Sequence, residues 1–302
     1  MRTLSFGSTG ASVQLLQLGL NRAGFGTLET DGIFGAATDN AVVRFQTSRR
    51  LAVDGIVGRQ TQAALEPYFT GFVRRRIRAG ESFFTLSREF NTSVEAIRTA
   101  NPAFPPEKIP VGTELVIPLA FPVVPDSIAF SSALLSYCVQ GLTARYPFLT
   151  AGEYGRSAMG RPLWQLRLGR GENRVLYTAS HHANEWIGSP LLLRFTEELC
   201  RAYAGGGSIF GQSAGELLSY TTLRLVPAVN PDGIDLVTGD IPDGPALRSA
   251  EAIARQYPAY PFPEGWKANL QGVDLNLQYP AGWEQARENK FALGIRSPAP
   301  AD

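Results

Sequence analysis

Residues 177–190 read YTASHHANEWIGSP, and both histidines of the 302-residue chain lie in this stretch. Two apolar runs with strand-like composition precede it: PLWQLRLG from Pro162 and RVLYTAS from Arg174. The run IGSPLLLRFTEELCRAY from Ile187 follows, and its apolar residues have helical spacing. The pattern predicts that the histidines lie where a strand ends and a helix begins, which is where open α/β sheets bind their ligands.

His182 and Glu185 form a His-x-x-Glu pair within this stretch. Imidazole nitrogen and carboxylate oxygen are both zinc ligands, and a catalytic zinc ion uses three protein ligands and a water molecule. We expect both side chains to reach one metal ion, whereas His181 should point away. Taken alone, the pair is also compatible with a histidine that is hydrogen-bonded in a loop.

The formal net charge is +1, which gives no global electrostatic reason to expect nucleic acid or a membrane as the partner. The chain has no apolar run of about 18 residues and no recognisable secretory signal, so we expect a soluble chain without an export address. The basic run at 74–78 fits a solvated linker or strand edge, or a site for an anion. Cys138 and Cys200 fit two buried free thiols or one disulfide.

An internal repeat organises residues 4–66. TDGIFGAATDNAVVRFQ from Thr30 and VDGIVGRQTQAAL from Val53 share an Asp-Gly turn, then an apolar residue, a glycine and a threonine at matching positions. Each copy predicts a tight turn followed by a helix start. With an earlier amphipathic run that starts at Val13, the repeat predicts a small all-α bundle over residues 1–70.

Residues 73–118 predict a strand, two helices and a strand, a βααβ unit of α+β type. The following stretch PLAFPVVPDS contains three prolines and predicts a stiff linker over 119–127. A third region spans 128–302. The chain is therefore expected to be multidomain.

Several of these motifs resemble those of known families. Residues 1–70 resemble the peptidoglycan-binding domain of bacterial wall hydrolases, through GSTGASVQLLQLGLNRAGF and the two Asp-Gly turns. Residues 73–118 resemble a LysM module, which recognises glycans that contain N-acetylglucosamine. The turn of this module reads Glu81-Ser82-Phe83, where the usual module has Asp-Thr-Leu.

In residues 128–302, the motifs MGRPLWQLRLG, SHHANEW, VPAVNPDGIDL and GVDLNLQYPAGW resemble those of carboxypeptidase A-type zinc carboxypeptidases. The match is closest to the bacterial branch that includes γ-D-glutamyl-L-diamino acid endopeptidases. This resemblance implies the N-terminal part of an α/β zinc-carboxypeptidase domain with a mixed sheet.

The resemblance also implies roles for individual residues. His182 and Glu185 match the first two zinc ligands, and Asn276 matches the asparagine that holds the terminal carboxylate of the substrate. Lys267 falls near an arginine that stabilises the oxyanion, and a lysine supplies positive charge without the bidentate fork. Leu277 stands where most carboxypeptidases place an arginine that grips a free α-carboxylate. A substrate recognised by other features, such as diaminopimelate, is therefore expected.

The family also uses a third zinc ligand, a histidine, and a late glutamate as general base. No histidine follows His182, and Glu284 and Glu288 come too early to match that glutamate. We therefore expect a C-terminally truncated catalytic domain whose third zinc ligand is absent from this chain, with an exposed apolar sheet edge.

The leading hypothesis is a peptidoglycan-targeted zinc metallopeptidase that cleaves the γ-D-glutamyl to diamino-acid bond of wall stem peptides. Its expected partners are peptidoglycan glycan, through residues 1–118, and the stem peptide, through the catalytic domain. A non-catalytic wall-binding protein and a conventional metallocarboxypeptidase remain as alternatives. Both a cytoplasmic location and a spore or cell-wall location fit a wall substrate without a visible signal peptide.

Overall fold

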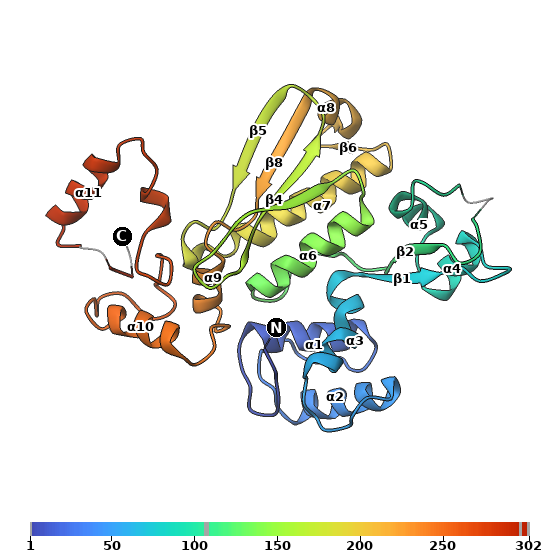
Figure 1. Ribbon diagram of the computed structural model, residues 1–302, viewed down its shortest axis with the longest axis horizontal. Coiled ribbons are helices and arrows are strands. Elements are labelled where there is room, and N and C mark those ends of the chain that lie inside the picture. Colours follow the sequence, from blue (N-terminus) through green and yellow to red (C-terminus); the bar gives the residue numbers. More distant parts are fainter. Residues whose placement is uncertain (1, 106–108, 296–297, 301–302) are drawn as a thin grey trace.

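The computed structural model describes residues 2–105, 109–295 and 298–300. A helical bundle, a small βααβ unit and a larger unit built on a mixed sheet follow one another along the chain (Figure 1). This arrangement confirms the predicted multidomain fold class. Within the described residues, none of the helices is both long enough and apolar enough to span a bilayer.

The N-terminal bundle consists of α1 (Ala11–Arg22), α2 (Ala36–Arg49) and α3 (Arg59–Thr70). The two copies of the internal repeat have the same hydrogen bonds around a buried glutamine. The Gln46 side-chain amide donates to Asp54, to the carbonyl of Ile56 and to Thr61, and its oxygen accepts the Gly55 N–H. Gln17 makes the equivalent bonds one repeat earlier, to Asp31, Ile33, Thr38 and Gly32. The repeated sequence therefore encodes two turns that are each closed by a glutamine from the preceding helix.

Replacing Gln46 with alanine should destabilise the bundle by about 2–3 kcal/mol, because the turn loses its buried partners and the polar groups left behind stay out of water. Chemical denaturation followed by circular dichroism measures the change. Gln60→Ala is the matched control, since Gln60 is exposed on α3, and it should change stability by less than about 0.5 kcal/mol. Equal losses for the two variants would contradict this role of Gln46.

The second unit pairs β1 (Phe72–Arg76) with β2 (Glu114–Pro118) in an antiparallel ribbon, and α4 (Phe83–Glu89) and α5 (Val94–Ala100) lie between them in sequence. Ser82 caps α4 and Ser93 caps α5, each by accepting a backbone N–H three residues later. Arg74 and Arg76 of the basic run are exposed on β1, and Arg74 pairs with Glu114 of β2. This pairing fits the strand-edge interpretation of the run.

The third unit contains a four-stranded sheet in the order β3-β4-β8-β5, in which β5 and β8 are parallel and the other pairs antiparallel. Its strands are β3 (Thr150–Arg156), β4 (Pro162–Gly169), β5 (Asn173–Thr178) and β8 (Thr221–Val226). Helices α6 (Ser132–Arg145) and α7 (Gly188–Ala204) cover one face of this sheet (Figure 1). The remaining elements are η1 (Ala183–Glu185), β6 (Ser208–Ile209), β7 (Gln212–Ser213), α8 (Ala214–Tyr220), α9 (Pro231–Val237), α10 (Pro245–Ala254), η2 (Leu275–Leu277) and α11 (Trp283–Ala292).

β5 forms one edge of this sheet in the part of the chain that the structure describes. Leu176 is 60% exposed and Tyr177 is 47% exposed on this strand. An unpaired edge with apolar side chains agrees with the expected aggregation-prone edge. Cys138 and Cys200 are buried free thiols, as one of the two predicted alternatives had it.

The bundle is docked on the third unit through the start of α1. Gly10 precedes α1 and has no side chain to cap it, so the first N–H groups of the helix need partners from elsewhere. The Asp240 carboxylate accepts the Ser12 N–H at 2.8 Å and the Ser12 hydroxyl at 2.9 Å, and the carbonyl of Thr238 accepts the Ala11 N–H. A helix of the first unit is thus capped by a residue more than 200 positions later.

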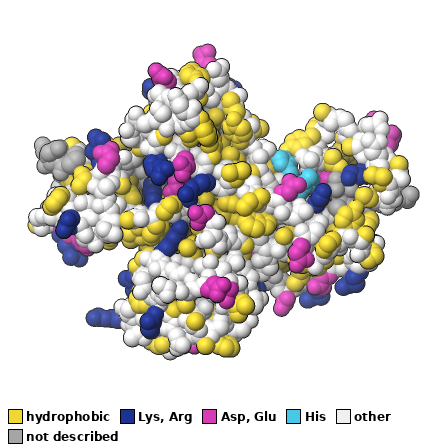
Figure 2. Space-filling model, turned by 180° about the vertical axis from the view of Figure 1, so that it is seen from behind, with side chains coloured by type: hydrophobic (Ala, Val, Ile, Leu, Met, Phe, Trp, Pro, Cys, Tyr) yellow, Lys and Arg dark blue, Asp and Glu magenta, His cyan; other side chains and the backbone are white. Residues whose placement is uncertain are grey.

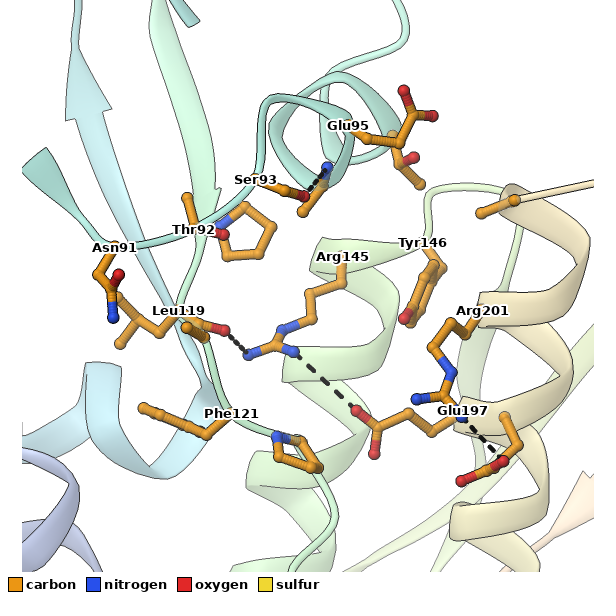
Figure 3. Close-up of a pocket in the computed structure, with 18 of the residues that line it drawn as sticks. Asn91, Thr92, Ser93, Glu95, Leu119, Phe121, Arg145, Tyr146, Glu197 and Arg201 are labelled. Carbon is orange, nitrogen blue, oxygen red and sulfur yellow. Dashed lines mark hydrogen bonds and ion pairs between the residues drawn. The ribbon is translucent and has the colours of Figure 1, made fainter. Parts of the chain in front are cut away.

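Arg145, at the end of α6, connects all three units (Figure 3). Its Nη2 donates to the carbonyl of Gly71, after the bundle, at 2.6 Å and to the carbonyl of Leu119, after β2, at 2.8 Å. Its Nη1 lies 4.0 Å from Glu197 on α7. Burial lowers the pKa of Arg145, and the charge of Glu197 opposes that shift. The side chain is 10% exposed, so these partners replace most of the water that a guanidinium would otherwise bind.

The segment predicted as a linker, 119–127, packs into the protein instead of crossing solvent. Val123 and Val124 are fully buried in the main hydrophobic core. Their N–H groups donate to the two carboxylate oxygens of Glu197, at 2.8 and 3.0 Å. Pro122 and Pro125 flank the two valines and restrict the backbone, but the position of the segment is determined by burial of the valines and by Glu197.

Arg145→Ala should destabilise the protein by about 3–5 kcal/mol, since it leaves Glu197 and two carbonyl groups buried without this partner. The Arg156–Glu153 pair is the control. Its nitrogen and oxygen are only 2.7 Å apart, but the side chains are 60% and 36% exposed, so Arg156→Ala should cost less than about 1 kcal/mol.

Urea unfolding measures the free energy of unfolding of both variants. Limited proteolysis between residues 118 and 123 reports on opening of the segment that joins the second unit to the third unit. Faster cleavage there in Arg145→Ala than in Arg156→Ala is the expected result. Equal cleavage and equal stability would contradict the role given to Arg145.

Candidate metal site

The loop that carries the two histidines begins where β5 ends and is held by the neighbouring strand end. Ala179 donates its N–H to the carbonyl of Val226 on β8, and Asn230 donates its N–H to the carbonyl of Ser180. Ser180 has a positive φ of 53°. Its hydroxyl donates to the carbonyl of Glu185 at 3.1 Å, which closes the loop onto the start of the next helix. The adjacent parallel strands therefore fix the backbone from which His182 projects.

A second segment of chain holds the loop from the other side. Ala183 donates its N–H to the carbonyl of Lys267 at 2.9 Å. The Asn230 side-chain amide donates to the carbonyl of His181 at 3.2 Å and to that of Ala268 at 3.0 Å. Asn230 itself is 2% exposed. One buried amide thus joins the histidine loop to residues almost 90 positions later.

His182 and Glu185 project from this loop toward one another. His182 Nδ1 lies 3.0 Å from Glu185 Oε1. Two ligands that each lie about 2.1 Å from a zinc ion are roughly 3.4 Å apart at a tetrahedral angle, so the observed separation is within reach of shared coordination. The histidine side chains reach the surface beside acidic side chains (Figure 2). The two side chains therefore lie close together, and their role as zinc ligands stays a prediction.

Asp274 contacts the other nitrogen of His182. Its Oδ1 lies 3.5 Å from His182 Nε2, and it also accepts the Asn276 N–H at 2.8 Å. A carboxylate behind a metal-binding histidine fixes the ring orientation and leaves the other nitrogen for the metal. Asp274 was not predicted from the sequence, although it is a carboxylate two positions before Asn276 in the motif GVDLNLQYPAGW.

His181 does not join this pair. Its Nε2 lies 2.8 Å from the hydroxyl of Tyr279, after η2. Burial and the neighbouring His182 lower the pKa of His181. The structure therefore places the first histidine of the two on a different partner, as expected.

A family model described as zinc carboxypeptidase matches residues 136–299, which is more than half of the chain. The chain belongs to the zinc carboxypeptidase family. A peptidoglycan binding domain model matches residues 9–65 and a LysM domain model matches residues 76–118, so the bundle and the βααβ unit are confirmed as members of these families.

The chain is also similar to individual proteins. The chain is 42% identical to γ-D-glutamyl-L-diamino acid endopeptidase 1 of Lysinibacillus sphaericus over 54% of this chain and 40% of that protein. It is 33% identical to carboxypeptidase E of Caenorhabditis elegans over 43% of this chain and 25% of that protein. The solved metallo-carboxypeptidase of Burkholderia cenocepacia is 22% identical, with a TM-score of 0.34 over 62% of this chain and 46% of that one. The chain thus spans about 40% of the length of the first of these relatives.

The other predicted site residues of the zinc carboxypeptidase domain lie on the two segments around the histidine loop. The carbonyl of Lys267 accepts a hydrogen bond from the Ala183 N–H, which brings the Lys267 backbone next to His182 in the loop. Asn276 and Leu277 are in η2, directly after Asp274, and Asn276 is exposed. The backbone therefore gathers all five predicted residues around one loop, and their roles stay predictions.

The donors fit part of a zinc site. His182 and Glu185 offer the nitrogen and oxygen that zinc takes, at a suitable separation. Within residues 2–105, 109–295 and 298–300, no group of three or more His, Cys, Asp or Glu side chains is arranged to hold a metal ion. The two donors that the sequence predicts for zinc therefore lie close together, and their role as ligands stays a prediction.

Asp274→Asn should weaken zinc binding about 10- to 100-fold, because an amide no longer favours the ring orientation and basicity of His182. His182→Ala should abolish binding at this site. Competition with a chromogenic zinc chelator measures both. Asp126→Asn is the control, since Asp126 is exposed and outside this site. Unchanged zinc affinity in Asp274→Asn would show that Asp274 does not support the ligand.

Proposed function

We propose that the protein to which this chain belongs is a wall-directed zinc peptidase that cleaves the γ-D-glutamyl to diamino-acid bond of peptidoglycan stem peptides. The observation that carries the proposal is the pair of His182 Nδ1 and Glu185 Oε1, 3.0 Å apart, in a chain that also holds two wall-binding modules. The 42% identity to an endopeptidase named for this bond supports the choice of substrate.

In this proposal His182 and Glu185 hold zinc, and the third ligand is not among the residues of this chain. Zinc, when bound, polarises a carbonyl and lowers the pKa of a water molecule. Asp274 keeps His182 Nδ1 directed at the metal position, because it contacts the opposite nitrogen. Lys267 supplies positive charge near a developing oxyanion.

Substrate selection in this proposal depends on η2. Asn276 donates from its amide to a carboxylate of the substrate, whereas Leu277 has no charge with which to hold a free α-carboxylate. An internal bond next to a diamino acid therefore suits the site better than the last bond of an ordinary protein. The wall modules raise the local concentration of such substrates and place the protein at the wall.

The test begins with the reading frame beyond codon 302 and uses the protein that the gene encodes. Incubation with L-Ala-γ-D-Glu-diaminopimelate should release the diamino acid, and mass spectrometry detects the product. A peptide with an ordinary C-terminal residue should be cleaved at least about 10-fold more slowly. Glu185→Gln should abolish the cleavage together with zinc binding. Preferential cleavage of the ordinary peptide would reject the proposed specificity.

One observation favours a second candidate, a non-catalytic wall-binding protein. The described residues present two zinc donors and no third one. In that case isolated peptidoglycan should bind the chain, whereas the purified protein should hold much less than one zinc ion per chain and leave stem peptides intact. Zinc measured by atomic emission on the natural protein separates the two candidates.

A further inference from the structure

A cavity of about 550 Å³ lies between the LysM module and the zinc carboxypeptidase domain (Figure 3). The LysM side contributes the loop before α5 and part of that helix, from Asn91 to Thr99. The catalytic-domain side contributes the end of α6 and the second half of α7, from Arg194 to Gly205. Residues 118–122 form the floor between them. The volume falls in the range of small-molecule sites, and neither module forms the cavity by itself.

The walls combine aromatic rings with polar side chains. Figure 3 shows the ring of Tyr146 beside Arg201 on one side and Phe121 below Leu119 on the other. Burial raises the pKa of Tyr146 to about 12, so its hydroxyl keeps its proton and remains a donor. Rings with polar neighbours suit a ligand that has both apolar C–H faces and hydroxyl or amide groups.

The charges of the cavity balance. Its lining includes three arginines and three glutamates: Arg145, Arg194, Arg201, Glu95, Glu197 and Glu198. Arg201 pairs with Glu198 at 3.0 Å on the surface of α7. Basic and acidic side chains are mixed on the molecular surface beside the LysM module (Figure 2). A lining without net charge disfavours a simple anion or cation and favours a neutral polar ligand.

A buried donor at the base of the cavity has spare capacity. Arg145 is 10% exposed, and its Nε and Nη2 are bonded to carbonyl groups. Its Nη1 lies 4.0 Å from Glu197 Oε1, which is beyond hydrogen-bond distance. A hydroxyl or amide oxygen placed in the cavity would complete the bonding of this guanidinium.

The cavity is separate from the candidate metal site. Helix α7 starts at Gly188, just after Glu185, and Arg194, the first of its residues that lines the cavity, is six residues further along. At 1.5 Å per residue this corresponds to about 9 Å along the helix axis. His182 and Glu185 are not among the residues that line the cavity.

We propose that this cavity is a second saccharide site, which holds an N-acetylated sugar of the wall glycan between the LysM module and the catalytic domain. The choice of a glycan as ligand rests on the proposed function, whereas the cavity, its rings and its balanced charges are independent of it. A sugar bound here would hold the glycan strand against the same rigid body that carries the metal site.

The test follows the amide signals of Thr99 and Ala204 by nuclear magnetic resonance while triacetylchitotriose is added to the full chain. These residues line the two sides of the cavity. Both signals should shift together with one dissociation constant. Arg201→Ala should raise this dissociation constant at least about fivefold, because one charged contact with the saccharide is lost. Arg201 is 70% exposed and belongs to the catalytic domain, so the variant should fold and leave the LysM module unchanged.

Arg174→Ala is the matched control, because Arg174 is exposed on β5 of the same domain and outside the cavity. It should change the constant by less than about twofold, as expected for a distant surface charge. Shifts confined to the LysM module, or equal effects of the two variants, would overturn the proposal. Shifts of Ala204 with a stem tripeptide but not with the saccharide would overturn the assignment to a sugar.

A double variant, His182→Ala with Glu185→Gln, separates this proposal from the proposed function. Saccharide binding at Thr99 and Ala204 should persist in it, because His182 and Glu185 do not line the cavity. If the natural protein fails to cleave stem peptides but these shifts occur, the peptidase proposal fails and the saccharide site stands. Loss of the shifts in the double variant would overturn the site as a separate one.

Discussion

The Arg145 guanidinium is the interaction on which the arrangement of the units depends. A buried guanidinium needs acceptors, and its donors reach the carbonyl after the bundle, at Gly71, and the carbonyl after β2, at Leu119. Glu197 lies on its other side and also accepts two N–H groups from the segment that follows. Because Arg145 and Glu197 bind groups from different units in this arrangement, a rotation of one unit would leave several buried polar groups without these partners.

The same constraint changes how the wall-binding modules act. Modules on free linkers would raise the local substrate concentration over a wide volume. Here Asp240 caps the first helix of the bundle, and the valines after the LysM module are buried in the main core. The modules thus keep a fixed direction relative to the metal site, and a glycan strand held by them would approach the catalytic domain from one side.

Much of the fold could be predicted from local patterns. The two Asp-Gly turns identified both helix starts in the bundle, because turn formation and capping act within a few residues. The strand, loop and helix around His182 and Glu185 followed from the change of apolar spacing in the sequence. Asp274, Asn230 and the cavity beside Arg145 could not be found in this way, because their partners are tens of residues away.

The sequence by itself determined the kind of each unit and predicted His182 and Glu185 as zinc ligands, since periodicity, turn residues and ligand types are local properties. Only the tertiary structure decided that residues 119–127 are part of the core, that Asp240 caps α1 and that Asp274 lies behind His182. The physical reason is the cost of burying polar groups. Each buried polar group needs a hydrogen-bond partner, and the folded chain supplies it from residues that are distant in sequence. Local sequence patterns do not show which distant residues come within hydrogen-bond distance.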